Sequence, residues 1–162
     1  PVFLDTSKDP MRIRYLRFSP YIDLYVIHLI RDVRGVVASI LSRRDDMSVQ
    51  QATHHWLIAE HNIRRHLESV PEDRQIEIHY KDVTTHTLET LNRVFTFIGV
   101  QPLQEMADFR ELDNHILGNK MRKQSTSEIK VDERWRTVLT EKQLELIETM
   151  ASPKISNWLK TA

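Results

Sequence analysis

An apolar stretch near the start of the chain ends abruptly in a charged turn and is followed by a helical pattern. Residues 24–30 are rich in branched and large apolar side chains, and His28 interrupts them. Such a run is typical of a strand that is covered on both faces, as in parallel α/β sheets. After Asp32, a natural N-cap, apolar residues recur at helical spacing as far as Leu41. The pattern therefore predicts a strand, a turn and a helix, with Arg31 at the carboxyl end of the strand.

The remainder of the chain alternates further short strands with amphipathic helices. Residues 2–4 and 75–79 have the pattern of two more strands, which we expect to be parallel to the first, with right-handed helical crossovers. The helices that apolar spacing and capping boxes predict cover residues 10–18, 33–44, 48–69, 88–98 and 140–151. A length of 162 residues suits one α/β domain.

The charge distribution along the chain limits the kind of ligand that it is suited to bind. The net charge is zero, but residues 1–44 hold eight Lys and Arg against four Asp. This local excess suits a small anion better than a nucleic acid, which normally requires a broadly basic surface. The absence of cysteine excludes disulfides and favours a cytoplasmic location, and no run of residues has the pattern of a membrane span.

The predicted strand end has the chemistry of a phosphate site. Ligands of open α/β sheets bind beyond the carboxyl ends of the strands, where helix N-termini present free N–H groups to anions. Arg31 stands at that end, and Ser39 follows eight residues later on the predicted helix. A guanidinium fork and a short hydroxyl together suit phosphate oxygens. The alternative is that Arg31 pairs with a nearby acid and that Ser39 has no binding role.

These residues resemble a known family. Residues 28–34, HLIRDVR, together with Ser39, are similar to the 3′-phosphate-binding segment of sulfotransferases that use 3′-phosphoadenylyl sulfate (PAPS). The resemblance implies that Arg31 and Ser39 hold the 3′-phosphate. Residues 78–100 resemble the family's Y-E-D-L and F-L-G-L segment, in which the strand-end Tyr contacts the adenine, a role that falls to Tyr80. The alternative for Tyr80 is packing on the rim of the sheet.

A turn near the N-terminus extends the resemblance. Residues 5–12, DTSKDPMR, are similar to the family's D-S-S-K-x-P-x-R pattern, which lies near the acceptor and the sulfuryl group. The resemblance therefore makes Ser7 and Lys8 catalytic candidates. A fixed ammonium would stabilise the charge that moves onto the leaving phosphate oxygen. The alternative is a helix-capping turn with a solvated lysine.

A later loop adds two more candidates. Residues 115–123 resemble the H-x-x-G-G-N-x-M-R loop of bacterial sulfotransferases and the M-R-K-G loop of cytosolic ones, which implies that Arg122 and Lys123 contact phosphate. We expect this loop to close over the ligand and to exclude water. Leu117 and Gln124 replace glycines of those patterns, and the change at Gln124 weakens the assignment of Lys123. The alternative is solubilising charge.

The resemblance implies a three-layer, helix-rich, parallel-sheet fold like that of P-loop NTPases. It implies transfer of a sulfuryl group from PAPS to a hydroxyl or amine of a small-molecule or carbohydrate acceptor, leaving adenosine 3′,5′-bisphosphate, without a metal. The family binds the 5′-phosphosulfate with an N-terminal Gly-rich loop, whereas this chain has three separate glycines and resembles the portion downstream of that loop. We therefore expect no transfer by this chain alone. The alternatives are a non-catalytic nucleotide-binding or interaction domain and, less well matched, a P-loop kinase relative.

Overall fold

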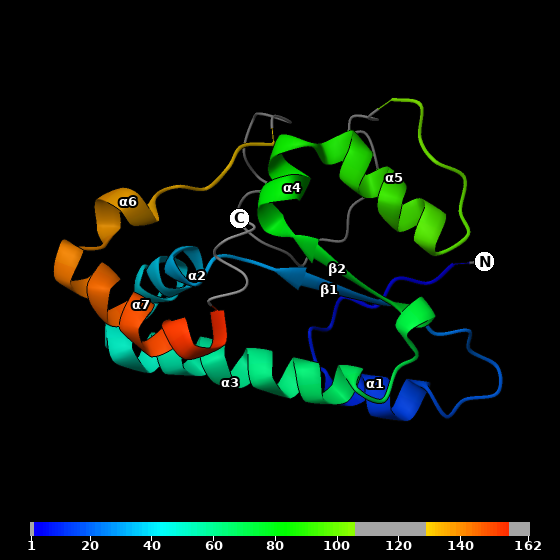
Figure 1. Cartoon of the computed structure of the whole chain (residues 1–162), viewed down its shortest axis with the longest axis horizontal. Helices are drawn as coiled ribbons and strands as arrows, with labels where there is room; N and C mark the ends of the chain where they lie inside the picture. Colours follow the sequence, from blue (N-terminus) through cyan, green and yellow to red (C-terminus); the bar gives the residue numbers. More distant parts are fainter. Residues whose placement is uncertain (1, 106–128, 156–162) are drawn as a thin grey trace. The chain divides into compact units, whose positions relative to one another are not determined.

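Two parallel strands form the sheet in the part of the chain that the structure describes. The computed structural model describes residues 2–105 and 129–155. Within them, β1 (Val26–Ile30) pairs in parallel with β2 (Gln75–His79), as the sequence predicts, and the register places Ile30 beside His79 (Figure 1). Parallel strands end at the same edge of a sheet. The residues that follow them, Arg31 and Tyr80, are therefore brought to one edge.

The chain divides into two compact units, one of residues 1–80 and 132–162 and one of residues 81–131. The helices of the first unit are α1 (Met11–Leu16), α2 (Val33–Leu41), α3 (Val49–Leu67), the 3-10 helix η1 (Glu72–Arg74), α6 (Trp135–Val138) and α7 (Glu141–Ile155). Helix α4 (Tyr80–Thr85) begins at the last residue of the first unit, and α5 (Thr87–Phe97) belongs to the second. In residues 2–105 and 129–155, every helix is too short or too polar to cross a lipid bilayer.

Three of the predicted helix starts, those of α2, α3 and α7, are confirmed by their caps. The Asp32 carboxylate accepts a hydrogen bond from the backbone N–H two residues later, at 2.8 Å. Ser48 and Gln51 form a reciprocal capping box, with distances of 3.2 and 2.8 Å. Thr140 and Gln143 form a second one at the start of α7. These side chains satisfy backbone donors that helical bonding leaves free, so they fix where each helix begins.

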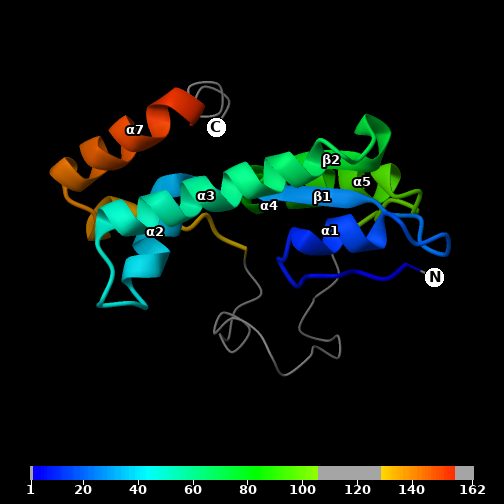
Figure 2. The ribbon, with the colours of Figure 1, turned by 90° about the horizontal axis from the view of Figure 1, so that it is seen from below.

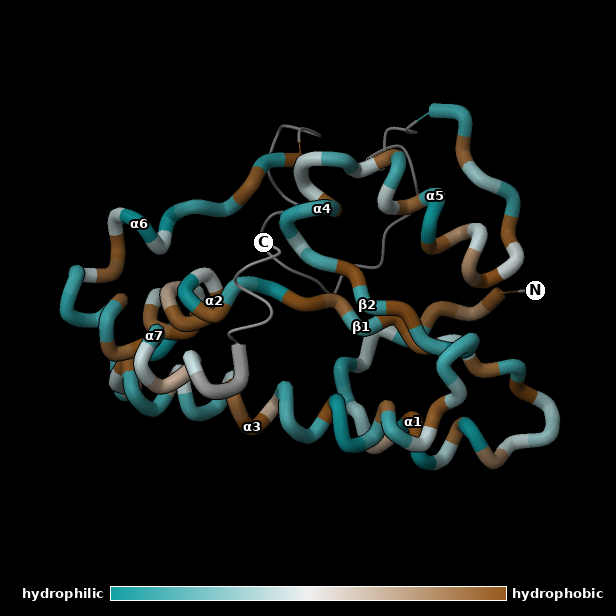
Figure 3. Tube along the Cα trace, viewed as in Figure 1, coloured by the Kyte–Doolittle hydropathy of each residue, from teal (hydrophilic) through white to brown (hydrophobic). Residues whose placement is uncertain are grey.

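The core of the first unit lies between its helices. Helices α2, α3, α6 and α7 contact one another and share a buried apolar cluster. Its members are Val33, Val37, Ala38, Val49, Ala52, Trp56, Trp135, Leu139, Ile147 and Ala151. Figure 3 shows apolar residues concentrated in the two strands and in α2, whereas α3 is largely hydrophilic. Burial of one face of α2 in this cluster holds the first turn of the helix at the end of β1.

The strand predicted for residues 2–4 is wrong. Val2, Phe3 and Leu4 are 68%, 89% and 71% exposed, and they belong to no strand. An isolated extended segment has no ladder of hydrogen bonds to stabilise it, so branched and aromatic side chains alone do not make a strand. The described sheet therefore has two strands rather than the three that the sequence predicts.

A buried polar cluster ties α3 to the sheet. Helix α3 runs along one face of the two strands (Figure 1, Figure 2). From β1, His28 points its Nε2 at Glu60 Oε2 of α3, 3.3 Å away, and its Nδ1 lies 3.8 Å from Glu77 Oε2 of β2. Both His28 and Glu60 are buried, and Arg64 of α3 also pairs with Glu77, at 3.1 Å. His28, the polar residue in the middle of the apolar strand, thus makes a tertiary contact with α3.

This cluster predicts a non-additive effect on stability. The substitution His28→Leu leaves the Glu60 carboxylate buried without its partner, and we expect it to lower the free energy of unfolding by about 3 kcal/mol. The double variant His28→Leu/Glu60→Leu should recover much of that loss, because neither buried polar group remains. Urea unfolding of both variants measures the difference. A double variant no more stable than His28→Leu would show that the pair does not couple the strand to the helix.

Candidate functional site

The guanidinium of Arg31 lies against the first turn of α2, at the end of β1. A Cβ atom added at Gly35 would be 3.2 Å from Arg31 Nε and 3.4 Å from Nη2. That is tighter than an ordinary van der Waals contact, so the absence of a side chain at residue 35 allows this approach. The Arg31 side chain remains 27% exposed. Its charge is therefore held at a helix N-terminus while part of it is accessible to a ligand.

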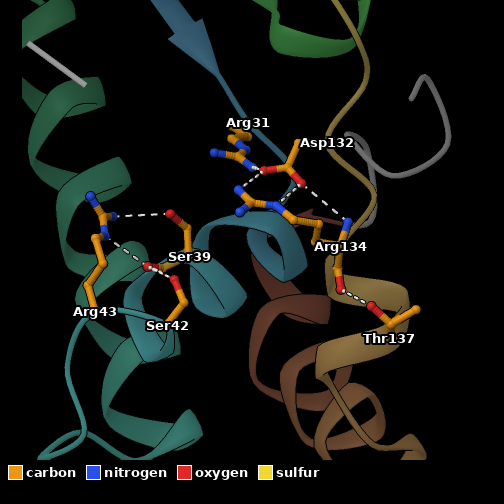
Figure 4. A network of polar contacts seen from close by, with 7 residues as sticks. All are labelled: Arg31, Ser39, Ser42, Arg43, Asp132, Arg134 and Thr137. Atoms are coloured by element: carbon orange, nitrogen blue, oxygen red, sulfur yellow. Dashed lines mark hydrogen bonds and ion pairs between the residues drawn. The ribbon is translucent and has the colours of Figure 1, made fainter. Parts of the chain in front are cut away.

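Two residues far apart in the sequence hold this guanidinium. Arg31 Nη2 donates a hydrogen bond to Asp132 Oδ2 at 2.9 Å (Figure 4). Its Cζ atom lies 4.9 Å from the centre of the Tyr80 ring, a cation–π contact. Arg31 and Tyr80, both predicted ligand residues, are thus brought together. The alternative for Arg31, pairing with an acid, is also observed, because Asp132 is that acid.

Asp132 in turn binds a second arginine. The side chain of Arg134 donates to both carboxylate oxygens, from Nε at 2.8 Å and from Nη2 at 2.7 Å, and its backbone N–H donates at 3.2 Å. The hydrogen bonds from Arg134, with a further one from Arg31, hold the pKa of Asp132 well below its ordinary value of 3.8, although partial burial acts the other way. Asp132 is therefore ionised at neutral pH, and two guanidinium groups against one carboxylate leave the cluster with a net positive charge.

Ser39 lies one helical turn beyond Gly35 on α2, on the same face of the helix. Its hydroxyl accepts a hydrogen bond from Arg43 Nη2 at 3.1 Å, and its carbonyl accepts one from Arg43 Nε at 2.9 Å. Figure 4 shows Ser39 and Arg43 apart from Arg31, Asp132 and Arg134, with no interaction drawn between the two groups. The structure thus places Ser39 one turn further along α2 than the Arg31 guanidinium, and it adds Arg43 as a cation next to the hydroxyl.

The turn that holds Ser7 and Lys8 has a strained backbone. The Ser7 N–H donates to Asp5 Oδ1 at 2.9 Å, and Lys8 has a φ of 61°, in the left-handed region that a residue with a side chain rarely adopts. Such outliers recur at functional sites. The side chain of Lys8 is exposed. In the described part of the chain, this turn makes no hydrogen bond or ion pair with the Arg31 cluster.

Two of the predicted phosphate ligands, Arg122 and Lys123, lie outside the described residues. The sequence pattern predicts no binding role for Asp132 or Arg134, which the structure brings to the end of β1. Their spacing of two residues is a signal for a local ion pair, but the sequence does not say which strand end that pair meets. Within residues 2–105 and 129–155, no group of three or more His, Asp or Glu is placed to hold a metal.

A cleft of about 500 Å³ lies elsewhere in the first unit, and its chemistry is unsuited to phosphate. It adjoins the start of β2, η1 and the last turns of α3. Three carboxylates line it, from Glu68, Glu72 and Glu77, against one guanidinium from Arg64. An anion would be repelled there. The cationic cluster at the carboxyl ends of the strands is therefore the better candidate for an anion site.

The chain shares its fold with a solved sulfotransferase. The sulfotransferase domain from the curacin biosynthetic pathway superposes with a TM-score of 0.59 at 16% sequence identity, over 90% of this chain and 59% of that domain. This chain thus spans a little over half of the length of that domain. No curated protein matches the chain.

A family model provides the assignment. The model described as "Sulfotransferase family" matches residues 8–105, from Lys8 through the end of β1, Ser39 and Tyr80 to the segment after α5. The match covers well over half of the 162 residues. It includes each candidate site residue except Ser7 and those of the later loop. The chain belongs to the sulfotransferase family.

Proposed function

We propose that this domain takes part in the transfer of a sulfuryl group from PAPS to a hydroxyl or amine of a small-molecule or carbohydrate acceptor. Arg31 and Ser39 bind the 3′-phosphate and Tyr80 contacts the adenine, in a fold like that of P-loop NTPases. The observation that carries the proposal is the guanidinium of Arg31, held over Gly35 at the N-terminus of α2 beside the Tyr80 ring. This arrangement offers charge, helix N–H groups and an aromatic surface at one place.

The reaction requires positioning more than covalent chemistry. The acceptor oxygen or nitrogen forms a bond to sulfur as the bond from sulfur to the bridging phosphate oxygen breaks. The electron pair stays on the phosphate, and the acceptor's proton passes to a base. A nearby ammonium stabilises the leaving oxygen, and we assign this role to Lys8, with Ser7 as a hydrogen-bonding partner in the same turn. Residues Arg31 and Ser39 fix the nucleotide so that its reacting end is held in place.

A second candidate is a nucleotide-binding domain without transfer activity. The observation that favours it is that, in the described part of the chain, the turn of Ser7 and Lys8 makes no hydrogen bond or ion pair with the Arg31 cluster. Binding of the 3′-phosphate is common to both candidates. A measurement of sulfuryl transfer therefore distinguishes the two candidate functions.

The proposal predicts a selective loss of affinity on removal of Arg31. Arg31→Ala should weaken binding of adenosine 3′,5′-bisphosphate by about 1.5 to 3 kcal/mol, the range for a hydrogen bond to a charged group. Binding of adenosine 5′-phosphate should barely change, because this nucleotide lacks the 3′-phosphate. Titration calorimetry, or NMR titration where affinity is low, measures both.

A matched control is Arg44→Ala, which removes an exposed guanidinium that pairs with Asp46. It should leave both affinities within about twofold, since surface ion pairs contribute little. Equal losses for the two nucleotides in Arg31→Ala would remove the assignment of the 3′-phosphate site.

A substitution at Gly35 gives a second test of the proposed 3′-phosphate site. Gly35→Ala should change stability by no more than about 1 kcal/mol, because the preference of alanine for the helix is opposed by the shift that its methyl group forces on Arg31. It should nevertheless weaken binding of the 3′-phosphate, because the methyl group meets the Arg31 guanidinium. Gly99→Ala is the opposite control, since Gly99 has a φ of 71° and open space around its Cβ position, so stability should fall and binding should not change. Unchanged binding in a well-folded Gly35→Ala variant would contradict the close approach.

Activity is expected to depend on a Gly-rich loop that this sequence does not contain. The 162-residue chain should bind adenosine 3′,5′-bisphosphate weakly and should transfer no sulfuryl group from radiolabelled PAPS to a permissive acceptor. Each missing oxyanion donor typically costs about a hundredfold or more in rate. A longer protein that carries such a loop upstream should turn over. Activity of the 162-residue chain alone would show that Lys8 and its neighbours supply the groups that we assign to that loop.

A further inference from the structure

The Asp132 carboxylate joins two guanidinium groups from different parts of the chain. Arg31 approaches it from the end of β1 through a single donor, Nη2, at 2.9 Å. Arg134 approaches it from two residues along the chain and donates from Nε, Nη2 and the backbone N–H. Figure 4 shows the carboxylate between the two arginine side chains. The Asp132 side chain is 16% exposed, so the carboxylate itself is largely covered by its neighbours.

This junction leaves donors of both arginines for a ligand. A guanidinium has five N–H donors, and Asp132 takes one from Arg31. The Arg31 side chain is fixed on three sides, by the first turn of α2 at Gly35, by the Tyr80 ring and by Asp132. The Arg134 side chain is 74% exposed, so its outward edge is open to solvent. Two forks of donors thus lie side by side at the strand end.

Without the carboxylate, the two guanidinium groups would repel each other. Like charges at close range are unfavourable, and each long side chain also gains conformational entropy when it is released. A phosphate with two negative charges is bound best by more than one cation. Asp132 therefore holds together an arrangement that would otherwise have to be assembled when the ligand binds, which would lower its affinity.

We propose that Asp132 is a positioning residue that holds Arg31 and Arg134 together as one double-arginine phosphate site, and that Arg134 is a further phosphate-binding residue. The inference rests on the proposed function, because it concerns the same 3′-phosphate. It adds two residues that lie outside the stretch matched by the family model. Asp132 acts through the arginines and does not itself contact the ligand.

The direction in which Asp132→Asn changes the affinity for phosphate distinguishes a positioning role from a purely electrostatic one. Asp132→Asn removes a negative charge close to the site, so electrostatics alone would make binding of a phosphate tighter. Positioning predicts the reverse, because a neutral amide cannot hold two guanidinium groups with charge-assisted bonds. The matched control is Asp46→Asn, which removes an exposed carboxylate that also pairs with an arginine two residues away and causes the same change in net charge.

The test is an NMR titration of the full 162-residue chain with adenosine 3′,5′-bisphosphate and, separately, with adenosine 5′-phosphate. Arginine Nε–H signals report on the site even when affinity is low. Asp132→Asn should weaken binding of the 3′-phosphate nucleotide by roughly tenfold, the effect of losing a charge-assisted bond, and should reduce its preference over the other nucleotide. Asp46→Asn should change neither. Equal or tighter binding by Asp132→Asn would overturn the positioning role.

Arg134 is tested in the same titration. Arg134→Ala should lower affinity for the 3′-phosphate nucleotide several-fold, and Arg134→Lys should not restore it, because an ammonium lacks the planar fork that binds the carboxylate and the phosphate together. This exposed residue can be replaced without disturbing the core, so the inference is testable even where Asp132→Asn lowers stability. Arg44→Ala again serves as the control, and full affinity in Arg134→Ala would overturn the role of Arg134.

The outcomes distinguish this inference from the function on which it rests. If the unaltered chain binds both nucleotides equally, the proposed function and the inference both fail. If it prefers the 3′-phosphate nucleotide and that preference survives in Asp132→Asn and Arg134→Ala, the inference alone is overturned.

Discussion

The ion pair between Arg31 and Asp132 joins residues that are 101 positions apart, and the geometry of the site depends on it. One partner ends β1, and the other lies just before α6. Helices α2 and α6 contact each other through the core that contains Trp135, so the packing that buries this tryptophan also delivers Asp132 to the strand end. The site is therefore a product of tertiary packing at both partners. A change in the core near Trp135 would therefore shift Asp132 and, through its hydrogen bond, the Arg31 guanidinium.

Parallel pairing supplies the other constraint. The register of β1 and β2 places Arg31 and Tyr80 at the same edge, and the short turn capped by Asp32 directs the N-terminus of α2 toward that edge. Gly35 then allows the guanidinium to lie against the helix. Charge, helix N–H groups and an aromatic ring thus converge because two strands end together. This convergence explains how a chain with no net charge presents a cationic cluster at one edge of the sheet.

Local signals were sufficient for much of this architecture. The apolar run before Arg31, the Asp32 cap and the Ser48–Gln51 capping box define β1, α2 and α3 by interactions within a few residues, and the structure has all three elements. Residues 2–4 failed as a strand because strand formation depends on a partner that local sequence does not reveal. Asp132 was missed for the same reason. Its role depends on a contact across the fold, whereas Arg31 and Tyr80 could be placed by their positions at strand ends and by resemblance.

The most direct measurement of the central claim is a crystal structure of the protein with adenosine 3′,5′-bisphosphate. Our account predicts the 3′-phosphate at the carboxyl end of β1, within hydrogen-bond distance of the Arg31 guanidinium and the Ser39 hydroxyl, with the adenine beside Tyr80. It also predicts that Asp132 still bridges Arg31 and Arg134 in the complex. A nucleotide bound elsewhere, such as in the acidic cleft beside η1, or a phosphate that displaces Asp132 from Arg31, would contradict the account.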